Sequence, residues 1–222
     1  MSVAESNTAE EDQDWGAAYR DRSMAARYDK RYRGLGRLNN AWIWRRLAAL
    51  LREAGDGRMP PLVIDAPAGT GRFTERLRAA GCPVLHLDRS VEMLRRARQK
   101  HGPGRYLLAD ALAPPLAAPD GAVAICFRFL QHFDRDGRVA ALRGMRGLAR
   151  HAVVAYYPGW HYKMALRRLR RRLHLPYHVI RERISREQIE AEVGEAGWRL
   201  RRLRQTLPLF SENVLLLLER EE

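Results

Sequence analysis

The chain has 222 residues, about the length of one globular domain. Hydrophobic residues make up 46% of it and charged residues 30%, as in ordinary globular proteins, and it has no run of about 18 apolar residues that could span a membrane. The formal net charge is +14. Three of the 40 basic residues are lysine, which leaves 37 arginines. We therefore interpret the charge as a bias of the whole surface, which tolerates anionic partners without naming one.

The first residues, 1–14, are polar and acidic and lack the apolar core of a secretory signal, so we expect a disordered lead-in there. A single domain is expected over 15–222. The two cysteines, Cys82 and Cys126, lie in or beside apolar segments, where buried free thiols in a reducing compartment are expected. The sequence thus predicts a cytoplasmic protein.

The expected elements alternate along the chain. Two helical stretches are expected over 15–54, the second with Trp42, Leu47, Leu50 and Leu51 near helical spacing. Short apolar strands and helices then alternate, which is typical of an α/β protein with a doubly wound, mostly parallel sheet, and the last two strands are expected to form an antiparallel hairpin on its edge. The seven strands are expected at 62–66, 82–88, 105–110, 121–129, 151–158, 198–206 and 212–220, and the later helices at 73–80, 90–100, 136–150 and 185–196.

A stretch of small residues, "VIDAPAGTGRF" (63–73), follows the first expected strand. A strand that ends in small residues and opens a helix lets a ligand approach the backbone and the free N–H groups of the helix. Ala68, Gly69 and Gly71 are expected to make this room, and Asp65 to accept hydrogen bonds from ligand donors. A simple tight turn is the alternative.

Acidic residues at the ends of the next strands favour an adenosine ligand. Asp88 ends the second strand, 23 residues after Asp65, where a carboxylate can bind two ribose hydroxyls. Asp110 ends the third strand, within reach of the adenine amine. A nicotinamide dinucleotide is the weaker alternative, because Gly69-Thr-Gly71 is followed by Arg72-Phe-Thr rather than by a third small residue.

These motifs together resemble the class I S-adenosylmethionine-dependent methyltransferases of the broad small-molecule "type 11" kind, over roughly residue 26 to the C-terminus. The matching segments are "VIDAPAGTGRF" as the cofactor loop, "LHLDRSVEMLRRA" as the ribose strand and its helix, "LLADALAPPLA" as the adenine segment and "AICFRFLQHF" as the fourth strand with its turn. The resemblance implies a Rossmann-like sheet and S-adenosyl-L-methionine as the cofactor.

The resemblance also implies which residues contact the cofactor. Besides the positions already named, it adds Ala66, Arg89, Ala111, Phe127 and Tyr28, the last on an N-terminal lid helix. The sequence departs from the family pattern at Pro67, where glycine is usual. Proline fixes φ and removes an N–H, so it fits if that amide is not a required donor.

Acceptor chemistry is expected beyond the fourth and fifth strands. His132 is the candidate general base, with a histidine bonded to backbone as the alternative. Arg128 is expected to bind an anionic acceptor or to pair with a neighbouring carboxylate. Tyr156 and Tyr157 either contact ligand or pack in the core. No metal site is expected, since Pro176 interrupts the helical spacing of His174 and His178.

A basic segment over 160–178 is expected as a helical insertion. Its leucines fall on one face and its arginines cover much of the rest, so 161–173 suits peripheral contact with an anionic lipid surface or a phosphate-bearing acceptor. A solvated helix whose leucines cover the sheet is the alternative. Nucleic acid is less favoured, since no aromatic residues interleave the arginine run.

We therefore expect methyl transfer to a small-molecule or lipid-like acceptor. The alternatives are a methyltransferase acting on RNA or protein, and a non-catalytic relative, for which Pro67 is the one favourable feature. Acceptor recognition varies within one fold, so the sequence leaves the acceptor, and also the oligomeric state, open.

Overall fold

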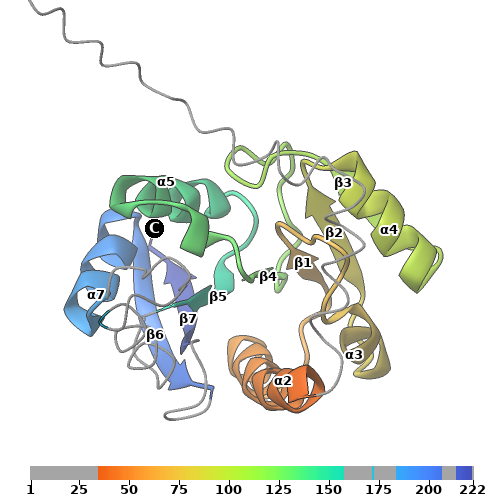
Figure 1. The fold of residues 1–222 in the computed structure, drawn as a ribbon, viewed down its shortest axis with the longest axis horizontal. Coiled ribbons are helices and arrows are strands. Elements are labelled where there is room, and N and C mark those ends of the chain that lie inside the picture. Colours follow the sequence, from red (N-terminus) through yellow and green to blue (C-terminus); the bar gives the residue numbers. More distant parts are fainter. Residues whose placement is uncertain (1–34, 158–171, 173–183, 207–213, 222) are drawn as a thin grey trace, which may run out of the picture.

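The structure is a computed structural model in which residues 35–157, 172, 184–206 and 214–221 are described (Figure 1). It contains one seven-stranded sheet in the order β3-β2-β1-β4-β5-β7-β6. The strands are β1 Val63–Asp65, β2 Val84–Asp88, β3 Arg105–Leu108, β4 Val123–Cys126, β5 His151–Tyr156, β6 Trp198–Gln205 and β7 Val214–Arg220. The helices are α2 Leu35–Ala54, α3 Thr74–Ala79, α4 Val91–His101, the 3₁₀ turn η2 Leu130–His132, α5 Arg135–Met145 and α7 Arg186–Glu195.

The first five strands are parallel, and β7 pairs antiparallel with both β5 and β6. Residues of α5 and α7 pack in one core on one face of the sheet, and residues of α2 and α3 pack in a second core on the other face. The central strands β1 and β4 are buried at every residue, as a parallel sheet covered on both faces requires. The predicted doubly wound, mostly parallel fold with a C-terminal antiparallel hairpin is confirmed.

Several predicted boundaries differ from the observed ones. The fourth strand ends at Cys126 because Arg128 adopts a positive φ of 60°, which turns the chain into η2. The helix predicted to Arg150 ends at Met145, and the glycine-bearing segment "RGLAR" after it forms a turn. On α2, Trp42 is 42% exposed, so it lies off the buried face that Ile43 and Leu47 occupy.

Helix starts follow the capping chemistry of the sequence. Ser90, the predicted N-cap of α4, accepts a hydrogen bond from the Met93 amide. Ser185 and Gln188 form a reciprocal capping box at the start of α7.

Both cysteines are free and buried, as predicted, and burial raises the pKa of Cys82 to about 11. In the described part of the chain no helix is both long and apolar enough to cross a bilayer.

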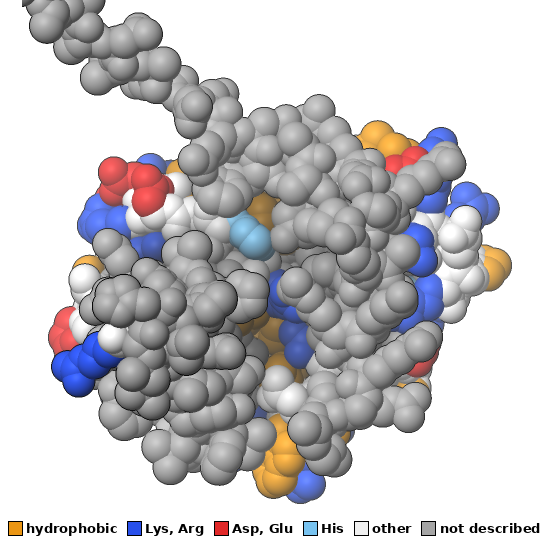
Figure 2. Space-filling model, viewed as in Figure 1, with side chains coloured by type: hydrophobic (Ala, Val, Ile, Leu, Met, Phe, Trp, Pro, Cys, Tyr) orange, Lys and Arg blue, Asp and Glu red, His pale blue; other side chains and the backbone are white. Residues whose placement is uncertain are grey.

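Charged side chains on the sheet edge gather around Glu219 on β7. Its carboxylate accepts hydrogen bonds from Arg199 at 2.5 Å, Arg201 at 3.0 Å and Arg150 at 3.3 Å. The Arg199 hydrogen bond is the main cause that lowers the pKa of Glu219 to about 2. Other arginines and lysines lie around the rim of the face in Figure 2.

The Glu219 cluster predicts an acid-sensitive contribution to stability. Because its folded pKa lies below the ordinary value of 4.5, the contribution is complete above pH 4.5 and is lost as the pH falls toward about 2. We expect the Glu219→Gln variant to lose stability at pH 7 and to approach the parent protein as the pH falls through this window. Urea unfolding from pH 7 to pH 2 measures it. A constant difference at every pH would contradict the assignment.

Candidate functional site

The carboxyl ends of β1, β2 and β4 meet where the strand order reverses. From β1 the chain runs outward to β2 and β3, then returns to pair β4 on the other side of β1. In open parallel sheets a crevice forms at this switch point, outside the carboxyl ends of the strands. The glycine stretch follows β1 directly into this place (Figure 1).

The glycine loop is held by hydrogen bonds from β2. The Ala68 amide donates to the Leu87 carbonyl at 2.8 Å, and the Gly69 amide donates to Asp88 Oδ2 at 2.8 Å. Gly69 has φ 54°, and a Cβ placed on it would meet no atom within 4 Å. Its backbone therefore faces open space, as a ligand-facing glycine should. The bond between Ala66 and Pro67 is cis.

Gly71 is also needed for packing within the protein itself. It has φ 71°, and a Cβ there would lie 2.5 Å from Thr74 Oγ1 and 2.8 Å from His101 Nε2. The missing side chain thus makes room for the protein's own atoms. His101 Nε2 lies 3.0 Å from the Thr70 carbonyl oxygen and donates to it, tying the end of α4 to the loop.

A second histidine, His86 on β2, contacts Thr74, the first residue of α3 after the glycine loop. His86 Nε2 lies 2.7 Å from Thr74 Oγ1, and its ring stacks on Tyr106 at 4.7 Å between centroids. Burial lowers the pKa of His86 to about 4, so the ring is neutral at pH 7. Neither His86 nor His101 was predicted as a site residue. The polar His86 inside an apolar strand was the available signal.

The packing at Gly71 predicts that Gly71→Ala destabilises the fold. A non-glycine residue at this φ costs about 1 kcal/mol, and the clash with Thr74 and His101 adds to it, so we expect a loss of about 2–3 kcal/mol. Urea denaturation measures the loss. Gly81→Ala is the matched control, because Gly81 has φ 75° with no atom near its Cβ position. Equal losses in both variants would show that the clash contributes nothing.

Asp65 and Asp88 form a buried pair at the ends of β1 and β2. They are 4% and 5% exposed. Burial, and then the Asp88 charge, raise the pKa of Asp65 well above its usual range, while the Arg72 charge lowers it. Among the described residues none donates a hydrogen bond to Asp65. Within the described residues this carboxylate is therefore nearly buried and has no hydrogen-bond donor.

Asp88 is already hydrogen-bonded to the loop. Its Oδ2 accepts from the Gly69 amide and its Oδ1 from the Ser90 amide, each at 2.8 Å. Burial raises its pKa, and these hydrogen bonds oppose the rise. Each carboxylate oxygen has a further lone pair, so Asp88 can hold the loop and accept ligand hydroxyls together.

The third predicted acid lies farther out on the same edge. Asp110 is two residues beyond the end of β3 and is exposed, and its Oδ1 accepts from the Leu112 amide at 2.9 Å. Ala111 beside it is buried, whereas Arg89, which follows Asp88, is exposed. The three acids thus occupy the carboxyl ends of three adjacent strands, but only Asp65 and Asp88 share a buried position.

An aromatic pair lies beside the acids. Phe127 is 9% exposed and meets Phe73 edge to face, with 4.8 Å between the ring centroids. The Arg72 guanidinium lies 4.9 Å from the Phe73 centroid and its Nε donates to Asn40 at 2.8 Å. Arg72 and Phe73 were not predicted as site residues. Their place after the glycines was the signal for them.

The predicted acceptor residues lie at the ends of β4 and β5. His132 ends η2, where the Gln131 side-chain amide donates to its Nε2 at 3.2 Å. Arg128 and Tyr157 are half-buried. Tyr156 is buried and its hydroxyl donates to Glu192 Oε2 at 3.0 Å, so packing rather than ligand contact explains it. Tyr28 and the basic segment 160–178, except Arg172, lie outside the described residues.

An open cavity of about 170 Å³ lies beside these acceptor residues. It lies where the chain leaves β4 and β5, and Gln131, Tyr156 and Tyr157 contribute to its wall. In the described ranges no three His, Cys, Asp or Glu side chains gather as a metal site would require.

The sheet order and the glycine loop at its switch point define the class of fold: a Rossmann-like α/β sheet with an antiparallel C-terminal hairpin. Residues 63–152, about two fifths of the chain, match the model of the methyltransferase domain family. This segment includes the glycine loop, both buried acids and η2. Together with the relatives and solved structures described next, this match bears out the predicted resemblance to class I S-adenosylmethionine-dependent methyltransferases.

Comparison with known proteins gives relatives for the same segment. A malonyl-[acyl-carrier protein] O-methyltransferase of Pectobacterium atrosepticum is 39% identical over 94 residues, covering 39% of this chain and 36% of the relative. The match thus spans about a third of that relative's length.

Solved structures share the fold over most of the chain. Magnesium protoporphyrin IX methyltransferase from Synechocystis PCC 6803, with bound SAH, superposes with a TM-score of 0.65 at 22% identity, covering 83% of this chain and 85% of that one. Human N-acetylserotonin methyltransferase, in complex with SAM, superposes with a TM-score of 0.64 at 16% identity, covering 95% and 60%. At these identities the likeness establishes the fold alone.

Proposed function

We propose that the chain binds S-adenosylmethionine at the carboxyl ends of β1 and β2 and transfers its methyl group to a small-molecule or lipid-linked acceptor. The observation that carries the proposal is the buried Asp65–Asp88 pair around a glycine loop at the switch point of the sheet. The residues present fit this ligand. Asp65 is a nearly buried acceptor without a donor among the described residues, and a Cβ built on Gly69 would meet no atom within 4 Å.

Each part of the cofactor has a partner in the proposal. Asp65 accepts from the ammonium of the methionine end, and Asp88 accepts from the ribose hydroxyls. Asp110 and Ala111 border the adenine. The remaining predicted contacts, which approach by backbone or by packing, are Ala66, Ala68, Gly69, Gly71, Arg89, Phe127 and Tyr28.

The bound sulfonium supplies an already activated methyl group, so the residues of the chain have to align the acceptor and exclude water. His132 takes the acceptor proton in the proposal. Because an amide NH₂ can only donate, the lone pair of His132 that faces Gln131 lies on Nε2, and it takes the acceptor proton once the acceptor hydroxyl or amine replaces the Gln131 amide as the donor to Nε2. Arg128 and Tyr157 contact the acceptor.

Relatives support the acceptor class. The curated relatives are named for an acceptor linked to acyl-carrier protein, which agrees with a small-molecule or lipid-linked group. Peripheral membrane contact through 161–173 stays a prediction.

Calorimetry with S-adenosylhomocysteine tests the proposal. We expect binding by the full chain and a loss of at least about 10-fold in affinity for Asp88→Ala, because charge-assisted hydrogen bonds are removed. Asp136→Ala is the matched control, since Asp136 is exposed on α5 and pairs with Arg135. Absence of binding at high micromolar ligand would refute the proposal, and unchanged affinity in Asp88→Ala would refute the ribose contact.

A further inference from the structure

The cavity beside β4 and β5 has the size of one ring. Its volume of about 170 Å³ is close to that of an engineered protein cavity of about 150 Å³ that binds benzene. Apolar side chains from three segments line much of it: Leu130 and Phe133 after β4, Tyr157 after β5, and Ile184 before α7. The volume and the apolar part of the lining therefore suit a compact group of the size of one ring.

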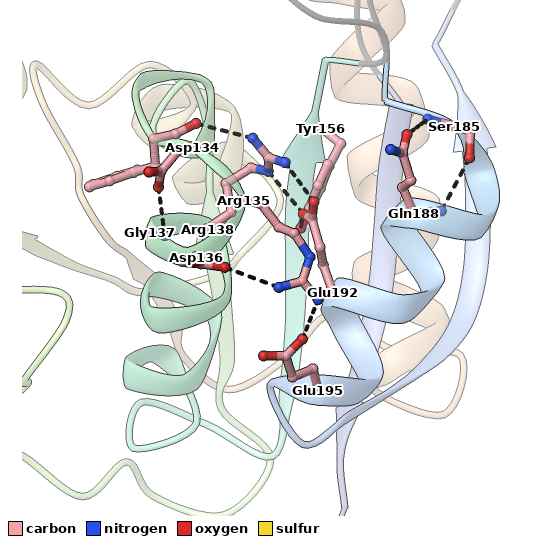
Figure 3. A network of polar contacts seen from close by, with 11 residues as sticks. Asp134, Arg135, Asp136, Gly137, Arg138, Tyr156, Ser185, Gln188, Glu192 and Glu195 are labelled. Atoms are coloured by element: carbon pink, nitrogen blue, oxygen red, sulfur yellow. Dashed lines mark hydrogen bonds and ion pairs between the residues drawn. The ribbon is translucent and has the colours of Figure 1, made fainter.

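The one arginine among the described lining residues is already paired. Arg138 Nε and Nη2 donate to the two Glu192 oxygens at 2.9 and 2.5 Å, and its Nη1 donates to the Phe133 carbonyl at 3.1 Å (Figure 3). The Glu192 side chain is 2% exposed, so the pair is shielded from water. The guanidinium is thus held with its charge balanced.

The other charge at the cavity is negative. Asp134 lines it and caps α5 by accepting from the Gly137 amide at 2.9 Å. An anionic group placed here would meet Asp134 and an arginine committed to Glu192, and would lose its hydration without a free cation among the described lining residues. An uncharged group avoids both costs.

The cavity also connects to the predicted base. Gln131 lines the cavity, and its side-chain amide donates to His132 Nε2 at 3.2 Å. A ring seated in the cavity would therefore lie one side chain away from His132, on the sheet edge where Asp65 ends β1, the neighbour of β4, and Asp88 ends β2, the next strand beyond β1.

From this geometry we propose that the cavity binds an uncharged, ring-sized part of the methyl acceptor. The proposal rests on the proposed function and narrows it, because it selects a neutral ring over the free carboxylate of an acyl group. The Arg138–Glu192 pair acts as the specificity element, since it neutralises the cation that would otherwise attract a carboxylate.

Two isosteric probes, 4-fluorobenzamide and 4-fluorobenzoate, test the proposal by ¹⁹F NMR titration of the full chain with saturating S-adenosylhomocysteine. We expect the neutral amide to bind at least about 10-fold more tightly than the anion. Ile184→Trp should fill the cavity and abolish amide binding, whereas Leu203→Trp on β6, outside the lining, should not. Equal or tighter benzoate binding, or amide binding that survives in Ile184→Trp, would overturn the proposal.

A variant that removes the charge of Glu192 tests whether the preference between the two probes shifts toward benzoate. Glu192→Gln keeps an acceptor for Arg138 and Tyr156 but removes the negative charge, so benzoate should gain at least about 10-fold relative to benzamide. Glu195→Gln, on the same helix but paired with Arg135, should leave the ratio unchanged. An unchanged ratio in Glu192→Gln would overturn the specificity role. Calorimetric titration of each variant with S-adenosylhomocysteine keeps failure of this proposal distinct from failure of the proposed function, because loss of cofactor-product binding would indicate the latter.

Discussion

Replacing Glu192 by alanine is expected to lower the free energy of unfolding by about 3–5 kcal/mol. The variant leaves the Arg138 guanidinium without its carboxylate and the Tyr156 hydroxyl without its acceptor. Tyr156 is 1% exposed, so its hydroxyl cannot turn to water, whereas the Arg138 side chain is 14% exposed and regains some hydration. The loss should therefore fall toward the lower end of the range.

Chemical denaturation of three variants measures this effect. Glu195→Ala is the control, because Glu195 lies on the same helix and pairs with Arg135 at the surface (Figure 3), where an ion pair contributes about 0–1 kcal/mol. A combined Arg138→Met, Glu192→Leu and Tyr156→Phe variant removes all three polar partners and should recover most of the loss. If Glu192→Ala lost less than about 1 kcal/mol, the network would not be a buried one.

Much of the fold could be predicted because strands buried on both faces leave a plain signal. The runs at 63–65, 84–88 and 123–126 are almost wholly apolar and are separated by segments with helical spacing. The ends of strands and helices were harder to predict where the φ angle of a single residue determines them. The positive φ of Arg128 ends β4, and no residue type in "CFRF" announces it, since arginine has no preference for that region.

The sequence predicted those parts of the candidate site that depend on the order of strands and helices along the chain. Asp65, Gly69 and Asp88 follow from one rule, that parallel strands bring their carboxyl ends to one edge. The network of Arg138, Tyr156 and Glu192 could not be found in this way, because its members come from α5, β5 and α7 and no spacing links them.

Gly71 and Asp110 show the same difference between what the order of the chain predicts and what packing determines. Gly71 was predicted to make room for a ligand, whereas the atoms nearest its Cβ position belong to Thr74 and His101 and depend on how α4 packs against the loop. Asp110 was correctly placed on the sheet edge, but its exposure depends on where β3 ends. Sequence order predicts the edge on which a residue lies, and packing decides what it touches.

Replacing Asp65 by asparagine is expected to stabilise the protein and to weaken cofactor binding together. Burial and the neighbouring Asp88 charge raise the pKa of Asp65, so folding is opposed by its ionised form. The stability that its neutral form allows is complete below the ordinary value of 3.8 and is lost as the pH rises from there toward the raised folded pKa. Asparagine cannot ionise, so the variant keeps that stability at pH 7.

The expected gain at pH 7 is about 1–3 kcal/mol, and it should vanish below about pH 4, where the parent residue is also neutral. Affinity for S-adenosylhomocysteine should fall about 10- to 100-fold, because a charge-assisted hydrogen bond to the ligand ammonium is worth about 1.5–3 kcal/mol. Urea unfolding at pH 4 and pH 7 and calorimetry measure the two effects, with the exposed Asp136→Asn as the control. A destabilised variant that binds normally would show that Asp65 supports the fold rather than the ligand. The expected result, a higher free energy of unfolding together with a lower affinity for S-adenosylhomocysteine, would show that the buried Asp65 carboxylate costs stability. Binding of the ligand ammonium would offset that cost.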